Sequence, residues 1–250
     1  MTHDTDHLAK VPALTLGFWI IKILATTLGE TGADLVTQQY GEGYLVGIAV
    51  FGVPLVALVA AQIRAKRFVP LLYWATILAS TTAGTALADY FTRDGGLGYA
   101  LGSAILLGCV MASLLVWRLV LGTVSVASLS NARAEAFYWI TITFSQTLGT
   151  ALGDWSADDG GLGYLGGAAV FGGLIAVLAL LYWRTGISRV ALFWSAFILT
   201  RPLGATVGDF LDKPHAQGGL DLGRDWATGA LVLAIALALW LVPQRAGRAH

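Results

Sequence analysis

The sequence predicts an all-α integral membrane protein with eight transmembrane helices, on the basis of three observations. Of its 250 residues, 56% are hydrophobic and only 12% are charged, whereas about 25% of the residues of a soluble domain are charged. The charges separate long apolar runs, and a pattern inside these runs recurs four times. A soluble domain of this composition would expose large apolar patches and aggregate, so we expect a lipid bilayer around the helices.

Eight runs are suited to helices that cross a membrane. Six of them contain no charge: 43–63, 68–88, 95–117, 136–153, 160–183 and 226–244. Each is close to or above the length of about 18 residues that a spanning helix needs. Two more runs are as apolar but contain charges, namely 11–35 with Lys22, Glu30 and Asp34, and 190–211 with Arg201 and Asp209.

The charges of the loops predict the orientation in the membrane. With an even number of spans, ten Lys and Arg residues fall on the side of the termini, and only Arg93, Lys213 and Arg224 fall on the opposite side. Because positive residues favour the cytoplasmic side, we expect both termini in the cytoplasm and a multi-pass protein of the bacterial inner membrane. Three tryptophans near the inner ends of even-numbered spans are expected as interfacial anchors: Trp117, Trp183 and Trp240.

The odd-numbered runs share one internal pattern. Each has an aromatic residue and a tryptophan, followed fifteen residues later by an aspartate: Phe18-Trp19 and Asp34, Tyr73-Trp74 and Asp89, Tyr138-Trp139 and Asp154, and Phe193-Trp194 and Asp209. A glycine precedes each aspartate by five residues: Gly29, Gly84, Gly149 and Gly204. Glycine-rich segments at 40–44, 95–99 and 160–164, with a degenerate copy at 218–220, predict turns that need positive φ. Four copies at one spacing indicate a fourfold internal repeat.

The repeat divides the chain into segments. They are an N-terminal cytoplasmic tail (1–11), repeat 1 (12–66), repeat 2 (67–121), a cytoplasmic linker (122–133), repeat 3 (134–186), repeat 4 (187–243) and a C-terminal tail (244–250). This organisation resembles a family of bacterial membrane proteins built from four tandem copies of a repeat of unknown function. In that family each copy has two transmembrane segments and a characteristic tryptophan, a position that Trp19, Trp74, Trp139 and Trp194 fit. The resemblance implies this topology and no established activity.

A repeat of two spans returns to the side from which it started, so the four repeats have the same orientation in the membrane. A pseudo-fourfold ring and a pair of pseudo-twofold halves both satisfy this condition. Residues four apart share a helix face, and counting back from each aspartate gives a polar stripe on every odd helix, whereas the even helices have none. Because a polar stripe facing hydrocarbon is costly, we place the odd helices inside and the even helices outside, around a pseudo-symmetric centre.

The stripes supply the candidate ion or substrate pathway. It consists of Lys22, Thr26, Glu30, Asp34, Thr81, Thr85, Asp89, Gln146, Thr150, Asp154, Arg201 and Asp209. Two interpretations of the four aspartates stay open, either hydrated or structural groups at the helix ends, or groups that line a mouth or bind an ion. The four glycines, each with a small residue four positions later, are expected to pack helices closely. The tryptophans of the repeats are expected as packing or interfacial anchors.

Charges in the middle of a span require partners. An unpaired one costs about 2.5–3.5 kcal/mol at the centre of a spanning helix. If the repeats close into a ring, repeats 1 and 4 are neighbours, and we expect Arg201 to meet Glu30 with Asp34 or Asp209 nearby. This pair is either purely structural or part of a substrate or coupling site that broke the ancestral symmetry.

The hypothesis that follows is a transporter or gated channel for a small ion. Oxygen ligands favour a hard cation such as Mn²⁺, Mg²⁺ or Ca²⁺, or a proton-coupled ion, while the buried positive charges leave an anion pathway open. The alternative is a non-transporting membrane scaffold or sensor. No catalytic set predicts an enzyme, and no cofactor or particular metal is assigned. The formal net charge of zero argues against a nucleic-acid partner, and a homo-oligomer remains an open alternative.

Overall fold

The computed structural model describes residues 8–129 and 131–248, so residues 1–7 and 249–250 of the two predicted tails and residue 130 of the linker lie outside the described part. The described residues form eight α-helices: α1 (Leu16–Asp34), α2 (Tyr44–Arg64), α3 (Pro70–Asp89), α4 (Tyr99–Leu121), α5 (Ala132–Ala157), α6 (Gly163–Arg184), α7 (Arg189–Asp212) and α8 (Arg224–Leu241). Short turns of helix follow four of them: η1 (Leu35–Gln39), η2 (Tyr90–Asp94), η3 (Val126–Ser128) and η4 (His215–Gln217). Two short strands, β1 (Leu8–Pro12) and β2 (Ala246–Arg248), pair antiparallel.

Six of these helices are long and apolar enough to cross a membrane: α2, α3 with its extension η2, α4, α6, α7 and α8. The remaining two, α1 with 19 residues and α5 with 26, are also long but are not among these six. The eight expected helices are therefore present, and the membrane-spanning capacity is confirmed for six of them.

Local sequence signals explain where the helices begin. The N-caps of α1, α5 and α7 are Thr15, Asn131 and Ser188, whose side chains accept a hydrogen bond from a backbone N–H in the first turn. Pro70 stands at the first position of α3, where its missing N–H costs nothing. The even helices instead follow glycine turns, and the positive φ expected there is confirmed at Gly96, Gly98, Gly161 and Gly163, with values of 64–69°.

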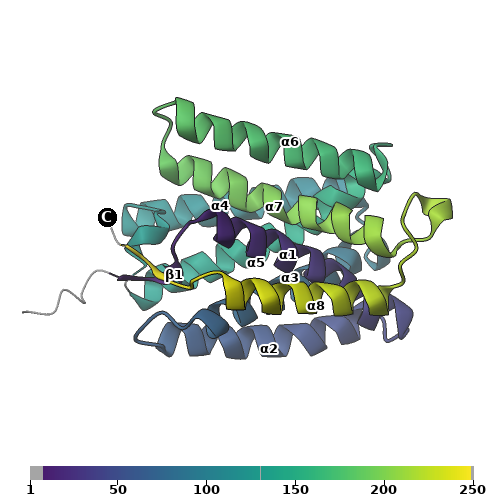
Figure 1. The fold of residues 1–250 in the computed structure, drawn as a ribbon, viewed down its shortest axis with the longest axis horizontal. Helices are drawn as coiled ribbons and strands as arrows, with labels where there is room; N and C mark the ends of the chain where they lie inside the picture. Colours follow the sequence, from purple (N-terminus) through teal and green to yellow (C-terminus); the bar gives the residue numbers. More distant parts are fainter. Residues whose placement is uncertain (1–7, 130, 249–250) are drawn as a thin grey trace, which may run out of the picture.

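The four odd helices form a closed inner ring. Helix α1 packs against α3, α3 against α5, α5 against α7, and α7 against α1. Each of the first three even helices packs mainly against the odd helix that follows it, so α2 covers α3, α4 covers α5 and α6 covers α7. Figure 1 shows the last of these pairs, with α6 lying along α7. Helix α8 covers α1 and completes the outer layer. Each repeat thus interlocks with the next, and the β1–β2 pair brings the two ends of the chain together.

Burial separates the two layers. In the most apolar windows of α3 and α7, 61% and 56% of the residues are buried, against 11–17% in α2, α4, α6 and α8. The outer helices expose large apolar side chains such as Val56, Leu119 and Leu233. Of the three expected anchors, Trp183 and Trp240 are exposed, but Trp117 is fully buried. The expectation that Trp117 is an interfacial anchor is therefore wrong, because its ring packs inside the bundle against Trp194 and Phe137.

Two sets of contacts repeat around the ring with fourfold regularity. A Cβ added to each repeat glycine would lie 2.2–2.9 Å from the side chain eight residues before the aspartate of the next repeat: Gly29 from Thr81, Gly84 from Gln146, Gly149 from Arg201 and Gly204 from Thr26. At the end of the helices near the termini, each repeat's aromatic residue packs on the next repeat's tryptophan. These pairs are Phe18–Trp74, Tyr73–Trp139, Tyr138–Trp194 and Phe193–Trp19, with ring centroids 5.6–6.1 Å apart. We call these eight aromatic residues the aromatic collar.

The close helix approach yields a stability prediction. In Gly84→Ala the new methyl group would lie 3.0 Å from backbone atoms of residues 146 and 147, which cannot rotate away. We expect a loss of about 1–3 kcal/mol of stability from overpacking. The matched control is Gly108→Ala on α4, where no atom lies within 4 Å of the added Cβ and the helix propensity of alanine is favourable. Thermal unfolding of the two purified variants in detergent tests this. An equal midpoint for Gly84→Ala and wild type would contradict the close packing.

Candidate functional site

The polar stripes of the inner helices meet along the centre of the ring, which we call the polar axis. All twelve pathway residues expected from the sequence face the interior and are at most 3% exposed. They form successive layers because residues four apart on each inner helix lie one turn apart. The layer nearest to the termini, beside the aromatic collar, contains Lys22, Ile77, Ile142 and Phe197.

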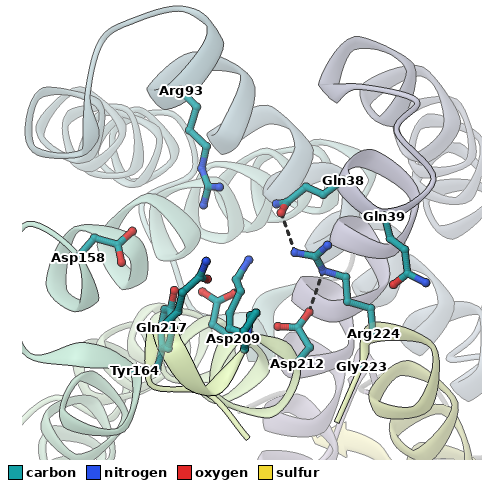
Figure 2. A pocket seen from close by; sticks show the side chains of 12 residues that line it. Gln38, Gln39, Arg93, Asp158, Tyr164, Asp209, Asp212, Gln217, Gly223 and Arg224 are labelled. Atoms are coloured by element: carbon teal, nitrogen blue, oxygen red, sulfur yellow. Dashed lines mark hydrogen bonds and ion pairs between the residues drawn. The ribbon is translucent and has the colours of Figure 1, made fainter. Parts of the chain in front are cut away.

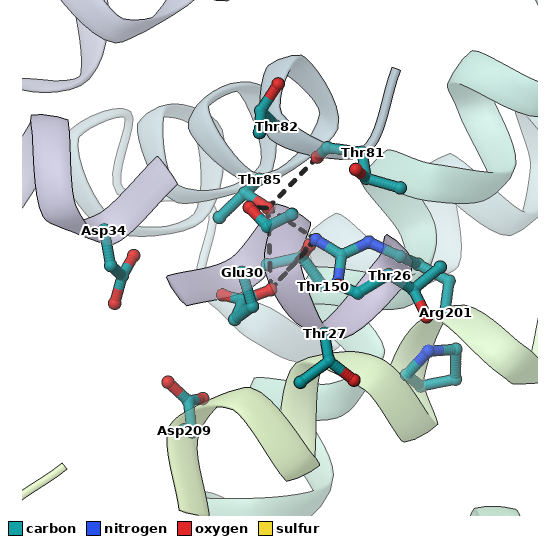
Figure 3. A network of polar contacts seen from close by, with 12 residues as sticks. Thr26, Thr27, Glu30, Asp34, Thr81, Thr82, Thr85, Thr150, Arg201 and Asp209 are labelled. Atoms are coloured by element: carbon teal, nitrogen blue, oxygen red, sulfur yellow. Dashed lines mark hydrogen bonds and ion pairs between the residues drawn. The ribbon is translucent and has the colours of Figure 1, made fainter. Parts of the chain in front are cut away.

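Arg201 is the centre of a buried polar network to which all four inner helices contribute (Figure 3). Its Nη2 lies 2.9 Å from Oε2 of Glu30 and donates to the hydroxyls of Thr85 and Thr150, while its Nη1 donates to the backbone carbonyl of Thr26 at 3.2 Å. Arginine suits this position because its several donors satisfy several acceptors at once. The ion pair expected between repeats 1 and 4 is therefore present, and all four inner helices contribute to it.

The four aspartates form the layer one turn further from the termini than Glu30, and we call it the acid layer. Two cationic side chains each bridge two of these aspartates. Arg93 lies 3.2 Å from Asp89 and 3.0 Å from Asp154. Lys213 lies 2.9 Å from Asp34 and 3.2 Å from Asp209. Arg93 and Lys213 each follow an aspartate of their own repeat by four residues, where repeats 1 and 3 have Gln38 and Asp158 instead. The helix ring is thus fourfold, whereas its charged layer is twofold.

Beyond the acid layer lies a funnel of about 710 Å³ at the end of the bundle opposite the termini (Figure 2). Arg224 in its wall lies 3.1 Å from Asp212 and donates to the side-chain oxygen of Gln38 at 2.8 Å. Tyr164, Gln217 and Asp158 line other parts of the wall. The funnel therefore leads from solvent to Arg93, Lys213 and the carboxylate of Asp209.

Arg93, Lys213 and Arg224 are site residues that the sequence reasoning missed. They are the three positive residues that the sequence pattern assigns to the loops of the outer side, where they contribute only to the prediction of orientation. The available signal was their helical spacing, because Arg93 and Lys213 each stand one turn beyond an aspartate. Burial alone would lower the pKa of Lys213, but the carboxylates of Asp209 and Asp34 outweigh it and raise the pKa above its usual value.

The opposite end of the polar axis is closed. The aromatic collar contains Tyr73 and Tyr138, both at most 1% exposed, whose hydroxyls lie 2.7 Å apart. One helical turn from the collar, toward the acid layer, Lys22 is fully buried. Its Nζ lies 4.1 Å from the ring centroid of Phe197 and has no hydrogen-bond partner among the described residues. A cation–π contact supplies part of the missing stabilisation.

One cluster in the described part of the chain has the geometry of a cation site. Glu30, Asp34 and Asp209 each offer a carboxylate oxygen, and the three atoms lie within 4.8 Å of one another. Hard divalent cations bind oxygen ligands of this kind. Asp89 and Asp154 on the other half have hydroxyl groups, those of Thr85 and Thr150, one turn below them instead of a third carboxylate.

Comparison with known families extends the sequence pattern. The family described as Repeat of Unknown Function (DUF347) matches four times in tandem, over residues 17–68, 72–123, 137–188 and 192–246. No curated protein and no solved structure is detectably similar to the chain. Each of the four matches spans one inner helix and the outer helix that follows it. Since these matches cover most of its length, the chain belongs to the family of proteins built from this repeat of unknown function.

Proposed function

We propose that the protein is a gated membrane carrier or channel for a small ion, with a hard cation as the preferred substrate. In this proposal the eight helices cross a bacterial inner membrane, both termini are cytoplasmic and the funnel opens on the outer side. The exposed apolar side chains of α2, α4, α6 and α8 support the membrane location. The excess of Lys and Arg on the side of the termini supports the orientation.

A single observation carries the transport proposal. A stack of fully buried polar and charged side chains runs along the centre of the bundle and is reached from one end by the funnel. Burying charges is expensive even when they are paired, and replacing buried ion pairs with well-packed apolar side chains is often neutral or stabilising. Ionisable groups inside a bundle are in general associated with ion pathways and proton relays.

The arrangement favours a gated mechanism over an open pore. The aromatic collar closes one end of the polar axis, and the salt bridges of Arg93, Lys213 and Arg201 cross it at two levels. Fixed positive charges in a pore oppose the passage of cations. An ion can therefore pass only when these pairs separate, which a second conformation or a protonated carboxylate would allow.

The scaffold or sensor remains the second candidate, because the central charges of Arg201, Arg93 and Lys213 are all paired within the protein. Flux measurements separate the two functions. We expect the wild-type protein, reconstituted in proteoliposomes with a pH gradient, to carry at least one of Ca²⁺, Mn²⁺ and Mg²⁺ across the membrane faster than empty liposomes. If neither these ions nor protons cross faster than the background, the hard-cation carrier is wrong, and absence of flux of any ion, anions included, would favour the scaffold.

A further inference from the structure

The two halves of the acid layer differ in one carboxylate. In the half formed by α1 and α7, Glu30 stands one turn below Asp34 and joins Asp34 and Asp209 in the three-carboxylate cluster. In Figure 3 these three carboxylates face a common space. Asp34 is 1% exposed, and its Oδ1 has no hydrogen-bond partner among the described residues. A buried carboxylate oxygen in this state is an unused ligand.

A side chain of the protein already places a positive charge against this cluster. The Nζ of Lys213 lies 2.9 Å from Oδ2 of Asp34 and 3.2 Å from Oδ1 of Asp209. Lys213 directly follows the last residue of α7, and its side chain, which is 9% exposed, lines the funnel. Its ammonium can therefore move into the funnel through rotation of its own side chain, without unwinding α7.

We propose that Glu30, Asp34 and Asp209 form a divalent-cation site that Lys213 occupies as an internal competitor, so that the ion enters from the funnel as the ammonium leaves. The inference deepens the proposed function, on which it rests for its place in a transport pathway, while binding can be measured by itself. The site takes a hard cation of the size of Ca²⁺. Three evenly spaced oxygen atoms at the limit of 4.8 Å lie about 2.8 Å from their common centre, so a small contraction gives the 2.3–2.6 Å of Ca²⁺ ligands, whereas Mg²⁺, at 2.0–2.1 Å, requires a larger one.

The charges of this half support a divalent occupant. Four carboxylates are joined by ion pairs to three cationic groups: Glu30 to Arg201, Asp34 and Asp209 to Lys213, and Asp34 and Asp212 to Arg224. With all seven of these groups ionised, one negative charge is left over. Exchanging the ammonium of Lys213 for a divalent cation makes this group of charges neutral, whereas exchange for a monovalent cation leaves one negative charge.

The test measures Ca²⁺ binding to the purified full chain in detergent, by equilibrium binding of radioactive Ca²⁺ and by Ca²⁺-dependent thermal stabilisation. We expect Lys213→Met to bind Ca²⁺ at least about tenfold more tightly than wild type, as follows if the ammonium occupies the cluster in about nine molecules of ten. Adding Asp34→Asn to Lys213→Met is expected to remove this gain. Lys213→Gln replaces Lys213→Met if the latter does not fold.

The pseudo-symmetric position supplies the matched comparison. Arg93→Met removes the cation that bridges Asp89 and Asp154, but frees only two carboxylates, so its gain in Ca²⁺ affinity should stay within about threefold. Equal affinities in Lys213→Met and wild type, or an equal gain in Arg93→Met, would overturn the inference. Tight binding by Lys213→Met without flux of Ca²⁺, Mn²⁺, Mg²⁺ or protons in any variant would support the site and refute the carrier. Flux of another ion without the gain in affinity would do the reverse.

Discussion

Replacing Arg201 with methionine should destabilise the protein by about 3–5 kcal/mol, because the carboxylate of Glu30 then stays buried without its cation. Methionine retains the Cβ and Cγ atoms that pack on Gly149, so the loss reports the charge rather than the packing. The measurement is the thermal unfolding of Arg201→Met and of wild type in detergent, at the same protein and detergent concentrations. The hydroxyls of Thr85 and Thr150 also lose a donor, which adds to the effect.

A second variant isolates the role of the pair. Arg201→Met combined with Glu30→Gln removes both charges, and we expect it to recover a large part of the lost stability, since neutral replacements of a buried pair are often tolerated. The double variant should nevertheless have altered ion flux if the pair is part of the gate. A single Arg201→Met variant with wild-type stability would show that Glu30 is not buried beside a cation.

Asp89→Asn and Asp154→Asn are each expected to reduce ion flux in proteoliposomes to the background of empty liposomes. Both carboxylates are at most 2% exposed, and both lie within 3.2 Å of Arg93. An asparagine keeps the shape of the side chain but removes the negative charge that offsets Arg93 on the path of a cation. The initial rate of dye-reported ion uptake is the measurement.

The control for these variants is Glu42→Gln, which neutralises an exposed carboxylate beyond the acid layer and should retain most of the wild-type rate. Gel filtration shows whether each variant is folded. Unchanged flux in a correctly folded Asp89→Asn or Asp154→Asn protein would mean that ions take a path other than the polar axis.

Much of the architecture could be predicted from the repeat, because its spacing constrains the geometry. Four aspartates at one position relative to Trp19, Trp74, Trp139 and Trp194 require four equivalent helices. Periodicity in steps of four then identifies the face of each helix that is costly to expose. Arg201 and Glu30 could be paired from the assumption of a closed ring alone, since only then are the first and last repeats neighbours.

The remaining features depend on packing that a single sequence does not encode visibly. That α2 covers α3 rather than α1 is decided by the way in which side chains interlock, and both arrangements have the same hydrophobic pattern. The bridging positions of Arg93 and Lys213 depend on helix or turn continuing beyond the expected ends of the odd spans. The β1–β2 pair joins segments more than 230 residues apart, without a pattern in either.

The sidedness of the polar axis is the most direct test of the whole account. In a Cys109→Ser background, Gln217→Cys places a thiol on the wall of the funnel and Lys66→Cys places one in the exposed loop at the end near the termini. We predict that an impermeant maleimide applied to intact cells labels position 217, and labels position 66 only after the membrane is opened. Labelling of both positions in intact cells, or of neither until lysis, would contradict a polar axis that crosses the membrane and opens outward.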